Sequence, residues 1–341
     1  MEVREINRVL VVGAQGVLGA LVVRGFKDAG WVVRSAARRP VRGQVHLDLE
    51  RPESVAAALK KEELVINTVP DPDLRAERHV LEHGGALINV SALPAAVGRS
   101  LRAVAGAARG TVLMSAGLAP GLTTVAAADL LRQHPAASEL EIVYTISLAT
   151  PRGPASVDFI HRSLTALARH RTALVPLPGP FGERRCVGFG EGDAGWLGGI
   201  SEGRIVRQYV CVAERGLHER LLELNDAGAM NELPRSLLAS PKPLAERAAG
   251  EEPVAHWIAS LRAGRRLEAR TVECRGDFVH AARSVVVFAK ALLDGRRGGG
   301  CFQPEEICTL SDIETDLQAA GITVLSHTRP ALEGSAVTPG R

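Results

Sequence analysis

This sequence of 341 residues lacks the features that indicate a membrane-embedded, nucleic-acid-binding or secreted protein. No apolar run approaches the ~18 residues of a membrane span, and residues 1–5 do not resemble a signal peptide. Aromatic residues make up only 4%, and 41 Lys and Arg stand against 38 Asp and Glu. No basic stripe with interleaved aromatics is present. We therefore expect a cytoplasmic protein with neither a nucleic acid nor a membrane as its partner.

Cysteine and metal-ligand motifs are also scarce. The five cysteines form no C-x-x-C pair, so we expect free thiols in a reducing compartment. They are Cys186, Cys211, Cys274, Cys301 and Cys308. The segment from His79 to His83 matches the zinc pattern H-x-x-E-H, but the sequence offers no evident third ligand. We interpret the two histidines as a surface pair and expect no metal.

The most informative segment that is present runs from residue 9 to residue 19. A short apolar strand is followed by three glycines with the spacing G-x-x-G-x-x-G, and a helix follows them. The first glycine allows a tight turn, the second lets a pyrophosphate approach the backbone, and the third lets the helix pack on the strand. The predicted cofactor residues of this turn are Gly13, Gln15, Gly16, Val17, Leu18 and Gly19. The alternative is an ordinary strand-to-helix turn.

The end of the second predicted strand, residues 31–36, indicates which cofactor binds. A site that prefers NAD usually has an acidic residue there, but residues 34–40 contain no carboxylate. Arginine suits a 2′-phosphate because its guanidinium offers several donors and a full charge. We therefore predict NADP(H), bound by Arg38 and Arg39 with Ser35 as a supporting donor; the alternative is a solvated basic loop. We place Asp48, after the third predicted strand, near the adenine end.

Strands and helices alternate up to residue 115, which predicts a parallel, doubly wound sheet of the Rossmann type. The predicted strands are 9–12, 31–36, 45–49, 64–67, 86–90 and 111–115, and the predicted helices are 20–27, 52–60, 74–83 and 101–108. Such sheets bind ligands at the carboxyl ends of their strands. We therefore expect the following residues near the nicotinamide ribose: Asn67, Thr68, Val69, Pro70 and Ser91. The alternative for each is a connector without a ligand.

Four short segments follow one another in an order that carries a family resemblance. They are residues 64–70, residues 115–122 with the pattern G-x-x-P-G, residues 150–156, and residues 300–306 with Pro-Glu-Glu. Their order resembles that of the saccharopine dehydrogenase-like NAD(P)-dependent reductases over roughly residues 8–325. The chain departs from the family at Asn89, where an acidic residue is frequent, and at Pro154, where Thr is frequent.

The resemblance and the pattern of the second half together imply a split α/β architecture. We expect a Rossmann domain at 1–128, an inserted mixed α/β substrate domain at 129–300, a return to the Rossmann domain at 301–330, and a disordered tail at 331–341. Predicted elements of the second half are strands at 140–148, 205–213 and 268–274, and helices at 155–169, 279–293 and 311–320. We interpret the Gly-rich residues 188–203 as turns and residues 225–252 as an irregular excursion over the cleft.

The resemblance also implies a reaction: reduction of a C=N bond in an amino-acid-derived substrate, or oxidation of the matching secondary amine, by a homodimer. Arg152 and Arg162 are candidate clamps for a substrate carboxylate, and each is otherwise a surface charge. His161 or Tyr144 is the candidate proton donor, with a structural role as the alternative. Asp71 either orients the substrate or caps a turn. Two other functions stay open: an enoyl C=C reductase and a non-catalytic NADP(H)-binding protein.

Overall fold

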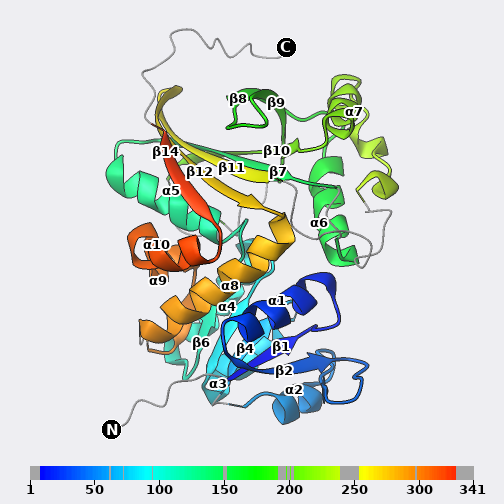
Figure 1. Ribbon diagram of the computed structural model, residues 1–341, viewed down its shortest axis with the longest axis vertical. Helices are drawn as coiled ribbons and strands as arrows, with labels where there is room; N and C mark the ends of the chain where they lie inside the picture. Colours follow the sequence, from blue (N-terminus) through cyan, green and yellow to red (C-terminus); the bar gives the residue numbers. More distant parts are fainter. Residues whose placement is uncertain are drawn as a thin grey trace.

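The computed structural model describes residues 8–60, 63–71, 73–93, 95–148, 152–190, 197, 200, 203–238, 253–295 and 298–327. Two seven-stranded sheets form the two halves of the molecule, and the long helix α8 (Asp277–Asp294) crosses between them (Figure 1). The predicted tail at 331–341 and the predicted excursion beyond residue 238 lie outside the described residues. None of the helices in the described part of the chain is long and apolar enough to span a membrane.

The first sheet is parallel throughout and has the strand order β13-β6-β5-β4-β1-β2-β3. Its strands are β1 (Arg8–Val12), β2 (Val32–Ala37), β3 (Val45–His46), β4 (Leu64–Asn67), β5 (Ala86–Asn89), β6 (Thr111–Leu113) and β13 (Gly300–Phe302). Six of them have the order of a doubly wound dinucleotide-binding sheet, in which the winding reverses between β1 and β4. The predicted Rossmann-type fold is confirmed, and β13 adds a seventh strand beside β6.

Helices cover both faces of this sheet because successive residues of its buried strands are apolar. Val9 and Val11 of β1 pack with α1 (Val17–Asp28) and α8, whereas Leu10 and Val12 pack toward the opposite face. The helices of that opposite face are α2 (Pro52–Ala58), α3 (Arg75–His83) and α4 (Ala95–Val104). The helices cover the two faces and leave the carboxyl ends of the strands uncovered. We call this end of the sheet the carboxyl edge; sheets of this type bind their ligands there.

The second sheet is mixed, with the order β14-β12-β11-β7-β10-β9-β8. Only β7 and β10 are parallel, and the other neighbours are antiparallel. Its strands are β7 (Glu139–Ile146), β8 (Thr172–Pro176), β9 (Glu183–Gly188), β10 (Ile205–Val212), β11 (Pro253–Arg262), β12 (Arg265–Arg275) and β14 (Thr323–His327). Its helices are α5 (Leu122–Gln133), α6 (Pro154–Thr165) and α7 (Arg215–Asp226), with 3₁₀ turns at Met230–Glu232 and Arg235–Leu237. Another 3₁₀ turn, Ala105–Ala107, follows α4 in the first half. This is the mixed sheet that the sequence predicts, although the prediction omits β8, β9, β11, β14 and α7.

The last part of the chain contributes to both sheets. Helix α8 packs against α1 of the first half and β12 of the second. β13 then joins the first sheet, and α9 (Pro304–Ile307) and α10 (Leu310–Ala319) follow it. The final strand, β14, pairs with β12. The structure therefore places residues 300–302 in the first sheet and residues 323–327 in the second, which differs from a return of the whole segment 301–330 to the first half.

Candidate functional site

At the carboxyl edge of the first sheet, hydrogen bonds connect the ends of β1 and β4. The backbone N–H and the hydroxyl of Thr68 both donate to the carbonyl oxygen of Val12, at 3.2 and 2.7 Å. Thr68 and Val69 are half-buried and Pro70 is exposed. Because the winding reverses between these two strands, the segments that follow them border the crevice where such sheets bind a dinucleotide.

The glycine-rich turn follows β1 at this edge. Gly13 has a φ of +80°, and a Cβ there would lie 2.3 Å from Cγ2 of Val69. A Cβ on Gly19 would lie 2.1 Å from the carbonyl oxygen of Gly13, so the helix can approach the turn only without that side chain. Gly16 is the N-cap of α1 and caps it with no side chain. Val17 and Leu18 begin this helix, so the first turn offers its N–H groups and its dipole to an anion.

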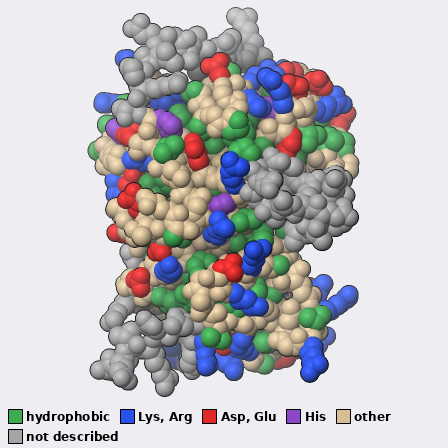
Figure 2. Space-filling model, in the orientation of Figure 1, with side chains coloured by type: hydrophobic (Ala, Val, Ile, Leu, Met, Phe, Trp, Pro, Cys, Tyr) green, Lys and Arg blue, Asp and Glu red, His purple; other side chains and the backbone are tan. Residues whose placement is uncertain are grey.

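Gln15 ties the glycine-rich turn to the loop after β2. Its Nε2 donates to the carbonyl oxygen of Arg39 at 2.9 Å and to Oε1 of Gln44 at 2.8 Å. The side chains of Arg38 and Arg39 are exposed on this loop. Figure 2 shows Lys and Arg side chains gathered at the lower end of the molecule, the end that carries the first sheet. The loop is therefore fixed close to the turn while its guanidinium groups stay accessible.

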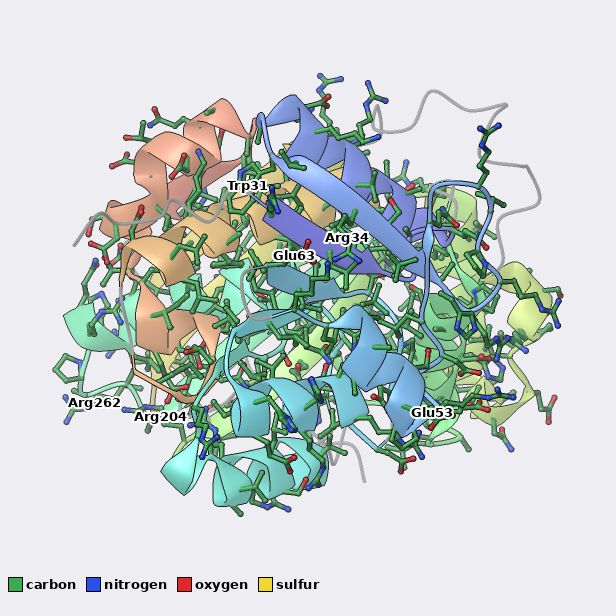
Figure 3. All side chains as sticks on the ribbon, turned by 90° about the horizontal axis from the view of Figure 1, so that it is seen from below. Trp31, Arg34, Glu53, Glu63, Arg204 and Arg262 are labelled. Carbon is green, nitrogen blue, oxygen red and sulfur yellow. The ribbon has the colours of Figure 1, made fainter. Side chains whose placement is uncertain are left out.

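The other polar residues near β2 have internal partners or lie within the strand. Arg34 forms an ion pair with Glu63, which immediately precedes β4; the two side chains point toward each other in Figure 3. Ser35 lies in β2 opposite Val11 and is half-buried. Asp48 lies in the turn before α2, where its Oδ1 accepts from the backbone N–H of Glu50 at 3.1 Å. Arg38 and Arg39 are thus the predicted cations with exposed side chains at this end of the edge.

Asn67, the last residue of β4, points toward α3 and not into the open crevice. Its Nδ2 donates to Oε1 of Glu77 at 2.9 Å, and Nδ2 of Asn89 donates to the same oxygen at 2.7 Å. Oδ1 of Asn89 accepts from the backbone N–H of Ser91 at 2.7 Å. Burial raises the pKa of the Glu77 carboxyl, while the two amide hydrogen bonds oppose that shift. Glu77 is not among the residues predicted from the sequence, because an acidic residue in the first turn of a helix is ordinary.

Asp71 has the capping contacts that the sequence offered as its alternative role. Its Oδ2 accepts from the backbone N–H of Arg75 at 2.7 Å, and its Oδ1 accepts from that of Asp73 at 3.1 Å. The residue is buried and holds the first turn of α3.

The predicted histidine pair lies on the same helix, where the rings of His79 and His83 stack with their centroids 4.3 Å apart. No group of three or more metal-ligating side chains is found among the described residues.

The candidate proton donors of the second half are engaged with other parts of the protein. The hydroxyl of Tyr144 donates to Oε1 of Gln208 at 2.8 Å within the second sheet, and both residues are buried. Nε2 of His161, on α6, lies 2.9 Å from the carbonyl oxygen of Leu233. These contacts fit the structural alternative for both residues.

The two candidate carboxylate clamps differ in their surroundings. Arg152 has a side chain that is only 3% exposed; it pairs with Asp277 at the start of α8 and donates to the carbonyl oxygen of Ser147 at 2.7 Å. Its charge is therefore already neutralised inside the protein. Arg162 is exposed on α6. Of the two, Arg162 has the side chain that solvent reaches.

A second buried carboxyl that was not predicted from the sequence lies past the end of β13. Oε2 of Glu305 accepts from the hydroxyl of Thr124 at 2.9 Å, which joins α9 to α5. Its Oε1 is buried without a hydrogen-bond partner among the described residues. Burial raises the pKa of Glu305 to about 7. The segment Pro-Glu-Glu carried part of the family resemblance, but the pattern alone did not indicate which glutamate is desolvated.

Two solved structures share this fold over nearly the whole chain. A homospermidine synthase from Legionella pneumophila in complex with NAD has a TM-score of 0.64 at 11% identity, covering 98% of this chain and 96% of that one. Apo saccharopine dehydrogenase (L-Glu forming) from Saccharomyces cerevisiae has a TM-score of 0.59 at 14% identity, covering 94% and 100%. Neither a protein-family model nor a curated protein sequence matches the chain. The fold is thus that of saccharopine dehydrogenase-like proteins, and the predicted resemblance is confirmed at the level of the fold.

Proposed function

We propose that this chain is an NADPH-dependent oxidoreductase. The proposal depends on the arrangement at the carboxyl edge, where an uncapped helix N-terminus and a glycine-rich turn lie beside a loop whose arginines, Arg38 and Arg39 among them, are exposed. Residues 38–44 of that loop include no carboxylate. A diphosphate needs the first two features, and a 2′-phosphate needs the third. One of the two structures of like fold was solved in complex with NAD.

The residues of the edge divide between the two ends of the proposed cofactor. The turn from Gly13 to Gly19 holds the pyrophosphate, and Arg38 and Arg39 hold the 2′-phosphate. The segments after β4 and β5, from Thr68 to Pro70 and at Ser91, border the nicotinamide end. When bound, the nicotinamide supplies the hydride, and the protein orients it and excludes water.

We propose a C=N bond of an amino-acid-derived substrate, or the matching secondary amine, as the reacting group. Two of the structures of like fold are a saccharopine dehydrogenase and a homospermidine synthase, which supports an amino compound. Arg162 is our candidate for a substrate carboxylate because its side chain is exposed. Domain boundaries at 128 and 300 belong to the same proposal, with the segment after residue 300 shared between the two halves. A cytoplasmic homodimer belongs to it as well, and light scattering on a sizing column tests the dimer.

A cofactor-binding protein without turnover is the second candidate. It is favoured by one observation: Asp71, Tyr144, Arg152 and His161 all have internal hydrogen-bond partners. An enoyl C=C reductase is the third outcome that the experiments below distinguish.

Fluorescence titration with NADPH and NADH tests the cofactor. We expect NADPH to bind at least about tenfold more tightly, because a charge-assisted contact to a phosphate is worth about 1.5–3 kcal/mol. Arg38→Ala should lower the affinity for NADPH about tenfold and leave the affinity for NADH unchanged. Arg24→Ala, an exposed substitution on α1, is the matched control. Equal affinities that Arg38→Ala does not alter would overturn the assignment of NADP(H).

A substrate panel, followed by nicotinamide absorbance, tests the reaction. Turnover of cyclic imines or of amine–carbonyl pairs supports the first candidate. Binding of cofactor with no turnover of any substrate supports the second, and turnover of enoyl thioesters alone supports the third.

A further inference from the structure

A buried carboxyl joins the ends of two neighbouring strands of the first sheet. Glu77 of α3 is 0% exposed, and its Oε1 accepts from the side-chain amides of Asn67 and Asn89 at 2.9 and 2.7 Å. These asparagines are the last residues of β4 and β5, and they are register partners in the sheet. One carboxylate oxygen therefore fixes the distance and the orientation of both strand ends.

Each asparagine also holds the backbone that leaves its strand. Oδ1 of Asn67 accepts from the N–H of Val69 at 3.0 Å, and Oδ1 of Asn89 accepts from the N–H of Ser91 at 2.7 Å. The main chain adds a third tie, because the N–H of Val90 donates to the carbonyl oxygen of Asn67 at 3.2 Å. The two segments that border the crevice on this side are thus held by contacts that converge on Glu77.

A separate contact holds the opposite side of the crevice. Gln15 binds Arg39 and Gln44 in the loop after β2, and no contact with Glu77 is involved. A dinucleotide lies across the reversal point of such a sheet, with its two nucleotides on opposite sides. In the proposed function the adenosine half lies on the side of β2 and the nicotinamide half on the side of β4 and β5.

We propose that Glu77 is a positioning residue for the nicotinamide half of the cofactor site, acting through Asn67 and Asn89. This inference rests on the proposed function, because it requires that a nicotinamide dinucleotide binds. It assigns Glu77 no contact with the cofactor.

The contacts of Glu77 indicate which substitutions keep its role and which remove it. Oε1 accepts both amides, and Oε2 is buried with no partner among the described residues. Asp71 at the start of α3 adds negative charge nearby, and it raises the pKa of Glu77 in the same direction as burial. The side-chain oxygen of a glutamine can accept the same two amide hydrogen bonds, so glutamine is the conservative replacement, and leucine, which has no acceptor, is the disruptive one.

Calorimetric titrations of a cofactor and of its adenosine half test the inference. NADPH is paired with 2′,5′-ADP, or NADH with 5′-ADP, according to which cofactor binds. We expect Glu77→Leu to lose about tenfold of the affinity for the dinucleotide, the equivalent of one to two hydrogen bonds, and to keep the affinity for the adenosine half within about twofold. Glu77→Gln recovers most of the loss. Gln15→Ala, on the opposite side, weakens binding of both ligands.

The outcomes separate the two claims. If the wild-type protein binds neither dinucleotide, the proposed function fails. If it binds one, and Glu77→Leu weakens the dinucleotide and the adenosine half equally or weakens neither, the positioning role is wrong, whereas the binding of a nicotinamide dinucleotide stands. If Glu77→Leu does not fold, as judged by its circular dichroism melt, Asn89→Ala takes its place. Its retention of full dinucleotide affinity would equally overturn the inference.

Discussion

At the scale of single residues, the hydrogen bonds between Asn89 and Glu77 require a neutral amide, and not a carboxylate, at position 89. Asn89 donates to Glu77 from one side-chain atom and accepts from Ser91 with the other. An acidic residue at position 89, frequent in the family that the chain resembles, has no such donor. It would place a second carboxyl beside a buried one, and two buried carboxyls that share a site do not both ionise readily.

Asn89→Asp should therefore destabilise the protein in a pH-dependent way. The crowding raises the folded-state pKa of the carboxyl pair, so stability present at low pH is lost as the pH rises through that raised value. We expect a loss of about 2–4 kcal/mol at pH 8 and a smaller loss at pH 5, measured by urea unfolding. Asn231→Asp, at an exposed position, should change stability by less than about 0.5 kcal/mol. An equal effect of Asn89→Asp at both pH values would contradict the shared-site argument.

Site residues that directly follow a strand were easier to predict than helix residues that contact the strand end from another element. Thr68 and Val69 follow an apolar run, and the end of a parallel strand places them at the edge. Glu77 lies ten positions after Asn67, and its contact depends on how α3 rotates onto the sheet. Asp71 and Tyr144 were predicted with a structural alternative beside the catalytic one, since residue type alone does not distinguish a cap or a core contact from a site.

At the scale of elements, α1 depends on one glycine for its position. A Cβ on Gly19 would meet three backbone atoms of the turn within 3.0 Å, and backbone cannot move aside as a flexible side chain can. Helix and turn would have to separate, which changes the same turn that the proposed pyrophosphate site uses.

Gly19→Ala should therefore cost about 2 kcal/mol of unfolding free energy, typical of overpacking, and should also weaken dinucleotide binding. Gly98→Ala is the matched control: Gly98 lies within α4, and a Cβ there meets nothing within 4 Å. Higher helix propensity should make that control neutral or slightly stabilising. Thermal unfolding and cofactor titration of both variants check this. A Gly19→Ala protein as stable as Gly98→Ala would show that the helix is not seated on the turn.

Helix α5 is fastened to the second sheet by Arg270 of β12. This side chain is 6% exposed, and it donates to Asp129 at 3.0 Å and to Gln133 at 2.7 Å. It also binds Ser326 of β14, so one guanidinium connects three elements.

Arg270→Ala should destabilise the protein by about 3 kcal/mol, because it removes a buried guanidinium from three partners and leaves Asp129 with only the longer ion pair to Arg132, at 3.6 Å. Arg24→Ala removes an exposed ion pair whose arginine side chain is 79% accessible, and it should cost less than about 0.5 kcal/mol. Denaturant unfolding of the two variants gives the comparison. Similar losses for both would mean that the buried network contributes no more than a surface pair.

Strands of the second sheet were harder to predict than those of the first. β11 reads Pro-Val-Ala-His-Trp-Ile-Ala-Ser-Leu-Arg and is buried from Val254 to Leu261. Burial on both faces removes the alternation that marks a half-exposed strand, and Ala, His and Ser have no strong preference for strands. The glycine-rich turn and the alternating order of the first half, by contrast, are local signals, and they predicted that sheet nearly completely.

At the scale of the whole molecule, the two sheets share one apolar core. Val9 of the first sheet and Ile142 of the second belong to the same cluster of buried residues, which α5 and α8 complete. Glu305 lies at this junction. It belongs to α9, which follows β13 of the first sheet, and its carboxyl accepts a hydrogen bond from Thr124 of α5. A charge there is desolvated by both halves, so its ionisation should affect the stability of the entire fold.

Glu305 should make stability fall as the pH rises from about 4.5 to about 7, the pKa values of the ordinary and the buried carboxyl. The raised folded-state pKa means that the neutral form is favoured on folding. Its contribution is complete below the ordinary pKa and disappears through the raised one. Glu305→Gln keeps the shape of the neutral form, and should gain about 2 kcal/mol relative to wild type between pH 5 and pH 8. Urea unfolding at the two pH values measures this gain. Glu306→Gln, which alters the neighbouring glutamate paired with Arg102, should not reproduce it. If both variants followed the wild-type pH dependence, Glu305 would be ionised over this whole pH range, and solvent would reach its carboxyl more than its contacts indicate.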